Sequence, residues 1–139
     1  MHLYVKVGSL FEREDERGIA HFLEHMLFNG SKNFPPGEMI KYFQRIGMQF
    51  GPDANAHTGF NETGYDVLLP DGAEKSLSEG LLVLRDYADG ALLLPDEVAK
   101  EKKVILAEKR SRNSARFRTL KASFRFEMPG LMVGERFPI

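Results

Sequence analysis

The sequence predicts an α+β fold in which helices pack against a small sheet. Two segments, Leu3–Val7 and Thr63–Leu69, alternate apolar with polar side chains at the period of two that is typical of strands. The rest of the second half repeats apolar residues at helical spacing, which predicts further helices after these strands. With 139 residues, 42% of them hydrophobic and 28% charged, the chain has the balance of one ordinary globular domain.

In the first third of the chain, turn residues separate the predicted elements. The strand Leu3–Val7 ends at Gly8-Ser9, and the charged segment Phe11–Gly18 is expected to form a loop. A helix is predicted from Ile19 to Phe28, because Asn29-Gly30 is a typical helix stop. A second helix, Glu38–Ile46, follows a Pro-Pro-Gly break.

The middle third predicts a strand pair and a third helix. Met48–His57 is expected to be extended, with Met48 and Phe50 on one side, and to pair antiparallel with Thr63–Leu69. A capping box of Ser76 and Glu79 is expected to open the third helix. Its predicted buried stripe consists of Leu77, Leu81, Leu84 and Ala88.

The last third predicts two further helices. Pro95, Asp96 and Glu97 suit the first turn of a helix that continues to Arg112. A final helix, Ala115–Phe126, ends before Pro129-Gly130, and its apolar side is expected to contain Phe117, Leu120 and Phe124.

Composition excludes several classes of site. There is no cysteine, so a transition metal would have to be bound by His, Asp and Glu. The net charge of −1 provides no overall field for nucleic acid or an acidic membrane. No apolar run approaches the roughly 20 residues that span a bilayer, so no membrane span is expected. The seven basic residues between Lys109 and Arg125 are interpreted as a solvated helix face rather than a nucleic-acid patch.

The segment His21-Phe22-Leu23-Glu24-His25 is the most informative part of the sequence. On a helix, residues four apart project from one face, so His21 and His25 can bind one Zn²⁺ with Glu24 beside it. The order H-x-x-E-H is the inverzincin signature. Two histidines and a glutamate on a helix with apolar neighbours need partners, which a metal supplies. The alternative is an ordinary helix whose histidines lie at the surface or are capped.

Catalytic zinc usually has three protein ligands and one water, so a third ligand is needed. The predicted helix Pro95–Arg112 offers Glu97, Glu101 and Glu108 at spacings of four and seven, on roughly one face. Glu108 could complete a His₂Glu set, and Glu101 could hydrogen-bond a ligating imidazole. In this hypothesis zinc activates a water, and Glu24 acts as general base and then as proton donor to the leaving amine.

The wider sequence resembles the pitrilysin family, which includes insulin-degrading enzyme and the mitochondrial processing peptidase. The resemblance rests on motifs in the family's order: Gly8-Ser9, Glu14 to Gly30, Asn55-Ala56-His57-Thr58, Glu62-Thr63-Gly64-Tyr65 and Glu101 to Glu108. The interval from His25 to Glu108 is longer than in those two enzymes and is similar to that of the long bacterial zinc proteases.

The resemblance implies one zinc held by His21, His25 and Glu108, Glu24 as base, and Glu101 in support of the metal. It places Asn55 and Ala56 on an edge strand that binds a peptide or an unfolded polypeptide as an added strand. It also implies an antiparallel-rich sheet with helices packed on it. His57 is interpreted as structural, since the family varies there, and His2 as inert.

The resemblance also implies that residues 1–139 form a partial N-terminal peptidase domain, truncated relative to a multi-domain protein. The remaining domains are then partners, and the segment alone is expected to be a poor enzyme. Homo-oligomerisation through an open sheet edge stays an alternative. A periplasmic or otherwise exported bacterial location is the expectation. Two other functions stay open: an inactive scaffold or peptide-binding member, and a metal enzyme that does not cut peptides.

Overall fold

The computed structural model describes residues 1–138, and its centre is a three-stranded antiparallel sheet. The strand order is β1 (His2–Val5), β3 (Thr63–Val67) and β2 (Ala54–Thr58), so β1 and β2 are both edges. β2 and β3 form a hairpin in which Thr58 lies opposite Thr63 and Ala54 opposite Val67. The prediction of an α+β fold with an antiparallel sheet is confirmed.

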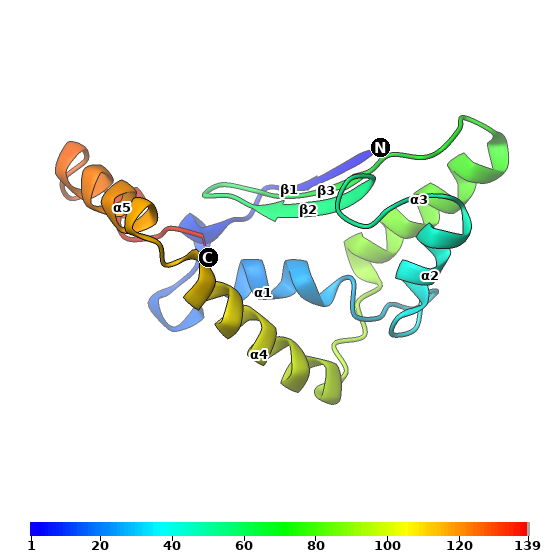
Figure 1. Ribbon diagram of the computed structural model, residues 1–139, viewed down its shortest axis with the longest axis horizontal. Helices are drawn as coiled ribbons and strands as arrows, with labels where there is room; N and C mark the ends of the chain where they lie inside the picture. The colour runs from blue at the N-terminus through cyan, green and yellow to red at the C-terminus, as the bar shows by residue number, and fades with distance from the viewer. Residues whose placement is uncertain (139) are drawn as a thin grey trace.

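Helices cover one side of the sheet in two layers (Figure 1). α1 (Ile19–Met26) lies directly beneath the strands, and α4 (Pro95–Arg112) lies beneath α1. This stacking places the H-x-x-E-H helix between the strand β2 and the long helix that carries the candidate third ligand.

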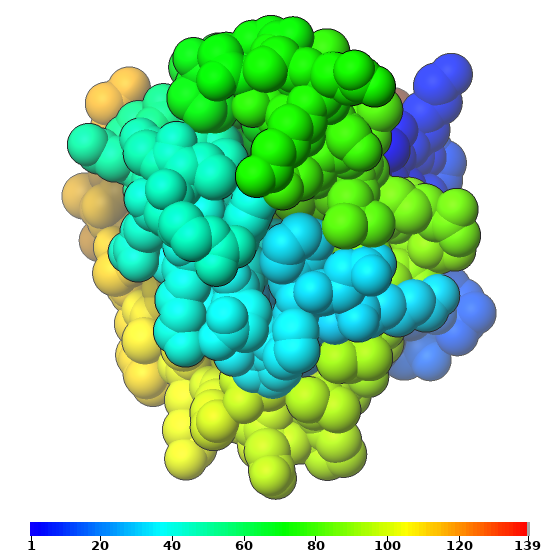
Figure 2. All heavy atoms as spheres, turned by 90° about the vertical axis from the view of Figure 1, so that its right-hand side faces the viewer, coloured from blue at the N-terminus to red at the C-terminus, as the bar shows by residue number. Residues whose placement is uncertain are grey.

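Three further helices lie at the two ends of the molecule (Figure 1). α2 (Glu38–Arg45) and α3 (Glu74–Asp89) lie at one end, and α5 (Ala115–Glu127) lies at the other. Figure 2 views the first of these ends, where α2, α3 and the first turns of α4 form the surface. Within residues 1–138, no helix combines the length and the apolar content needed to cross a membrane.

The core lies between the sheet, the end of α1, α2 and α3. Its members are buried apolar and aromatic side chains from all four elements: Leu27, Met39, Tyr42, Phe43, Met48, Ala54, Tyr65, Val67, Val83 and Tyr87. A buried hydrogen-bond network lies beside this core. In it, the Asp86 carboxylate accepts hydrogen bonds from Ser31 Oγ at 2.5 Å and from Asn33 Nδ2 at 2.7 Å. This network connects α3 to the loop that follows α1.

Several predicted details are wrong. α3 buries Gly80, Val83 and Tyr87, whereas Leu77 and Leu81 are 43% and 59% exposed. α3 begins at Glu74 without a side-chain cap, so the predicted capping box of Ser76 and Glu79 does not form. The Glu79 carboxylate instead accepts a hydrogen bond from the Tyr42 hydroxyl at 3.1 Å.

Three other segments differ from the prediction. Only Ala54–Thr58 of the predicted extended segment is a strand, because Gly51 and its neighbours form a turn that leaves Phe50 exposed. The predicted loop Phe11–Gly18 contains a short 3-10 helix at Glu14–Glu16. On α5, Leu120 is exposed, although Phe117 and Phe124 are partly buried as expected.

The core makes a direct prediction for stability. Phe43 has no exposed surface, so Phe43→Ala removes a ring and leaves a cavity, and we expect the free energy of unfolding to fall by about 3–5 kcal/mol. Phe126, which is 87% exposed, is the matched control, and Phe126→Ala should change the free energy of unfolding by less than about 0.5 kcal/mol. Urea denaturation of both variants measures the difference. Similar losses in the two would contradict this core.

Candidate metal centre

The start of α1 is organised by a carboxylate that lies outside the helix. Gly18, the residue before the helix, has φ +95°, which is the left-handed region that favours glycine. The Glu12 side chain accepts hydrogen bonds from the Gly18 N–H at 2.9 Å and from the Ala20 N–H at 2.8 Å. Glu12 therefore satisfies free N–H groups at the helix start, where a negative charge is also favoured by the helix dipole.

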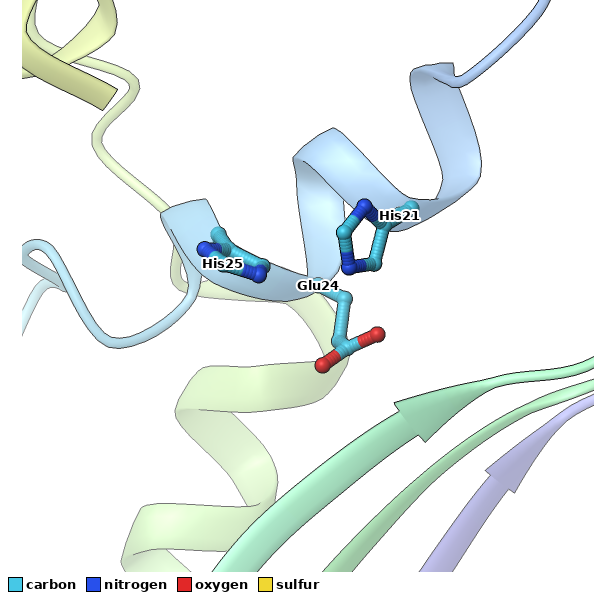
Figure 3. Close-up of side chains that lie close together, drawn as sticks. All are labelled: His21, Glu24 and His25. Atoms are coloured by element: carbon cyan, nitrogen blue, oxygen red, sulfur yellow. The ribbon is translucent and has the colours of Figure 1, made fainter. Parts of the chain in front are cut away.

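α1 presents His21, Glu24 and His25 on one side, as the spacing predicts. One donor atom from each lies within 4.8 Å of the other two. The two imidazole rings have centroids 4.6 Å apart and meet at an angle of 73°. Glu24 lies beside them and points toward the strands (Figure 3).

α4 brings Glu108 to both imidazoles. Glu108 Oε2 lies 3.6 Å from His21 Nε2 and 3.3 Å from His25 Nε2. Around a tetrahedral zinc with bonds of about 2.0–2.2 Å, neighbouring ligand atoms lie roughly 3.3–3.6 Å apart. The two distances therefore fit three donors that converge on one cation.

The protonation of the site supports the same interpretation. Burial, followed by the neighbouring His25, lowers the pKa of His21 to about 4, so its imidazole is neutral at physiological pH. The Glu108 carboxylate opposes this shift but does not outweigh it, so the short distance to His21 is not an ion pair. Glu108 Oε2 is buried and, within residues 1–138, has no hydrogen-bond partner. A buried carboxylate oxygen that lies beside the Nε2 atoms of two imidazoles is a good ligand for a divalent cation.

Glu101 orients one of the imidazoles. Its carboxylate Oε1 lies 2.7 Å from His25 Nδ1, which leaves Nε2 facing Glu108. The other oxygen, Oε2, accepts a hydrogen bond from Asn29 Nδ2 at 2.5 Å. A carboxylate on the far nitrogen of a histidine fixes the ring and its tautomer, as is usual around metal ligands.

This arrangement predicts an effect on metal affinity. Glu101→Gln replaces the acceptor carboxylate by a neutral amide, so His25 is held less firmly and zinc affinity should fall by about 10–100-fold. Glu97→Gln is the control, because Glu97 lies one turn earlier on α4 and pairs with Lys100 instead. Competition with a chromophoric chelator measures both affinities. Unchanged affinity in Glu101→Gln would show that this contact does not support the metal.

Glu24 is held by a different partner. Its Oε2 accepts a hydrogen bond from the Thr58 hydroxyl of β2 at 2.6 Å. Burial raises the pKa of Glu24, and the hydrogen bond from Thr58 partly opposes this shift. A carboxylate with a raised pKa accepts a proton more readily than an ordinary glutamate does, as a general base requires.

Asn55 and Ala56 lie on β2 at the open edge of the sheet. The Ala56 N–H donates to Asn55 Oδ1 at 2.9 Å, which shows that this N–H points away from β3. Both residues line a cavity of about 440 Å³ together with His21, Glu24 and His25. His57, on the same strand, packs its ring edge against Tyr4 with centroids 6.3 Å apart.

Three partners of the site were not predicted from the sequence: Thr58, Asn29 and Arg112, which pairs with Glu108 Oε1. Simple spacing would have indicated two of them. Asn29 lies four residues after His25, and Arg112 lies four residues after Glu108, so each continues a face that already carries a candidate. Thr58 is two residues beyond Ala56 and shares its face of the strand.

Residues 1–127 match the sequence model of the family described as Insulinase (Peptidase family M16). The chain is 36% identical over 137 residues to the probable zinc protease PqqL of Escherichia coli K12, covering 99% of this chain and 15% of that protein.

Two solved structures share the fold. The first half of the periplasmic protease PqqL from Escherichia coli superposes with a TM-score of 0.93 at 36% identity, and the match covers 99% of this chain and 29% of that one. Pitrilysin superposes with a TM-score of 0.73 at 27% identity, covering 99% of this chain and 14% of that one. The chain thus spans about 15% of the length of the curated Escherichia coli relative.

Proposed function

Because this chain belongs to the insulinase family, peptidase family M16, we propose that it carries the metal centre of a zinc-dependent endopeptidase. One observation carries the proposal: Glu108 Oε2 lies 3.6 and 3.3 Å from the Nε2 atoms of His21 and His25 and accepts no hydrogen bond from the described residues 1–138. Two relatives are named as probable zinc proteases, which supports a zinc-dependent function.

In this proposal His21, His25 and Glu108 hold one zinc ion. Zinc bound there would polarise a substrate carbonyl and lower the pKa of a bound water to about 7. The three side chains come from two packed helices, so the rigid contact between α1 and α4 sets their geometry.

Glu24 moves the protons. Its carboxylate takes a proton from the attacking water and then delivers a proton to the departing amine of the cleaved peptide. Thr58 holds the carboxylate by its Oε2, so the other oxygen, Oε1, is available for this exchange. The raised pKa of Glu24 favours a carboxyl group that can hold the proton between the two steps.

The substrate in this proposal is a peptide or an unfolded polypeptide. It would lie along β2, where the outward N–H of Ala56 is available once the Asn55 side chain turns away. Main-chain hydrogen bonds of this kind recognise an extended backbone, and the cavity beside the strand accommodates side chains.

The complete protein is proposed to be longer than this segment, with an N-terminal peptidase domain of which residues 1–139 are part. The E. coli relative has more than six times the length matched here and is described as periplasmic, so export from the cytoplasm is proposed for this protein as well. The isolated segment should cleave peptides poorly, because the other domains of a multi-domain peptidase help to bind the substrate.

A peptidase assay on the complete protein tests the proposal. Quenched-fluorescent peptides should be cleaved, cleavage should stop after dialysis against a zinc chelator, and it should return when zinc is added. Cleavage that persists in the chelated, zinc-free protein would refute the zinc mechanism. A zinc-loaded protein that binds but never cleaves peptides would indicate a scaffold or peptide-binding member.

A further inference from the structure

A second cavity adjoins the metal centre on the side of His21. Its volume is about 710 Å³, and it shares His21, Thr58 and Arg112 with the smaller cavity described above. Its walls come from α4, from α5, from the segment 9–18 and from the segment 134–138. A substrate that leaves the metal centre along the Thr58 end of β2 would therefore enter this cavity.

The wall of this second cavity, called the basic cavity below, is rich in cationic side chains. Two carboxylates line it, Glu12 and Glu135, and the first of these is bound to the start of α1. Seven cationic side chains line it: Arg17, Lys109, Arg110, Arg112, Lys121, Arg125 and Arg136. Cations thus outnumber carboxylates on this wall, in a chain whose net charge is −1.

Three of these cations have no anionic partner. The other four pair with carboxylates of the chain: Arg17 and Arg136 with Glu14, Arg112 with Glu108, and Arg125 with Glu135. Within residues 1–138, no carboxylate lies at ion-pairing distance from Lys109, Arg110 or Lys121. Like charges gathered around a hollow repel one another and favour an anion between them.

Helical spacing places these cations on one side of each helix. Leu106, Lys109 and Arg110 share the face of α4 that lines the cavity, and Phe117 and Lys121 share the corresponding face of α5. The Lys121 ammonium lies 4.8 Å from the centroid of the Phe117 ring, a cation–π contact that holds it at the cavity wall. Six of the seven basic residues between Lys109 and Arg125 are exposed, as a solvated helix face requires, and five of the seven also line this cavity.

We propose that the basic cavity is a specificity subsite for acidic side chains of the peptide substrate, on one side of the scissile bond. The proposal rests on the peptidase function proposed above. An Asp or Glu a few residues from the scissile bond would place its carboxylate among Lys109, Arg110 and Lys121. On the other side, the smaller cavity is lined by Phe28, Ile40 and Phe50, and Arg112 is the one Lys or Arg among the described residues of its wall.

Peptide is a better fit than nucleic acid for two reasons. The basic cavity is continuous with the centre where the peptide bond would be cut, and it shares Thr58 with the edge strand that would bind the peptide. In addition, the net charge of −1 gives the chain no extended positive field for a polyanion.

The test compares peptides that carry Glu with peptides that carry the isosteric Gln. Each position near the scissile bond is substituted in turn, and kcat/KM is measured with the complete, zinc-loaded protein. We expect about a tenfold preference for Glu at one or two positions on one side only, and a smaller preference at high salt. The triple variant Lys109→Gln/Arg110→Gln/Lys121→Gln should reduce the preference to about twofold or less.

A matched variant controls for net charge. Lys102, Lys103 and Arg116 lie on the same two helices outside the cavity, so the triple change of these residues to Gln removes the same charge and should keep the preference. Equal cleavage of Glu and Gln peptides by the wild-type protein, or the same loss in both triple variants, would overturn the subsite while leaving the peptidase function intact.

Binding measurements separate this proposal from the peptidase function. If no peptide is cleaved, fluorescence anisotropy with labelled Glu and Gln peptides still tests whether the subsite binds acidic side chains. The subsite is supported if the wild-type protein binds the Glu peptide more tightly and only the triple variant of Lys109, Arg110 and Lys121 loses this difference. Equal binding of the two peptides by the wild-type protein overturns it. Stronger competition by a single-stranded oligonucleotide than by the Glu peptide would also overturn it, in favour of a nucleic-acid site.

Discussion

Glu108→Gln is expected to abolish stoichiometric zinc binding. The change keeps the shape of the side chain but replaces an anionic oxygen, which lies 3.3 Å from His25 Nε2 and 3.6 Å from His21 Nε2, by a neutral amide. A lost ligand should matter more than a lost supporting residue, for which 10–100-fold losses are typical, so we expect at least about a 100-fold fall in affinity. Zinc content after dialysis and competition with a chelator measure it.

The order of effects is as informative as the loss itself. Glu101→Gln should weaken zinc binding less than Glu108→Gln, because Glu101 contacts His25 Nδ1 rather than the face shared by the two imidazoles. Far-ultraviolet circular dichroism should show that both variants keep their helices. A Glu108→Gln protein that holds one zinc with wild-type affinity would exclude Glu108 as the third ligand.

Glu24→Gln is expected to have the opposite profile, with zinc retained and peptide cleavage lost. The amide oxygen can still accept the hydrogen bond from Thr58, so the local structure should persist, but an amide cannot take a proton from water. Loss of a general base typically costs about 10²–10⁴ in rate, and kcat/KM of the complete protein should fall by at least this factor.

A second glutamate provides the control for this variant. Glu127, at the end of α5, is exposed and lies outside the proposed metal centre, so Glu127→Gln should cleave peptides at the wild-type rate. Wild-type cleavage by Glu24→Gln would show that another group acts as base. Loss of zinc together with activity would instead mean that Glu24 helps to hold the metal.

Most of the geometry of the candidate metal centre can be predicted from sequence because helix geometry is local. The spacing of His21, Glu24 and His25 places them together on any regular helix, and Glu101 and Glu108 share a face for the same reason. What spacing does not specify is which helices pack together. The contact between α1 and α4 depends on the tertiary fold, and so does the hydrogen bond that Thr58 donates to Glu24.

The errors in the fold have equally physical causes. In α3 the run Leu81, Leu82, Val83, Leu84 is apolar all round, so periodicity does not specify which residues face the core, and the true stripe runs through Val83 and Tyr87. The expected capping box failed because α3 starts at Glu74, two residues before Ser76. Before β2, the positive φ of Gly51 makes a turn where hydrophobic alternation predicted a strand.

The most direct test of the metal centre is anomalous diffraction at the zinc edge from crystals of the zinc-loaded protein. The expected result is one peak within about 2.0–2.2 Å of Nε2 of His21, Nε2 of His25 and a carboxylate oxygen of Glu108, with Glu24 unbound. A peak bound to Glu24 or Glu101 instead of Glu108, or a peak remote from both imidazoles, would contradict it.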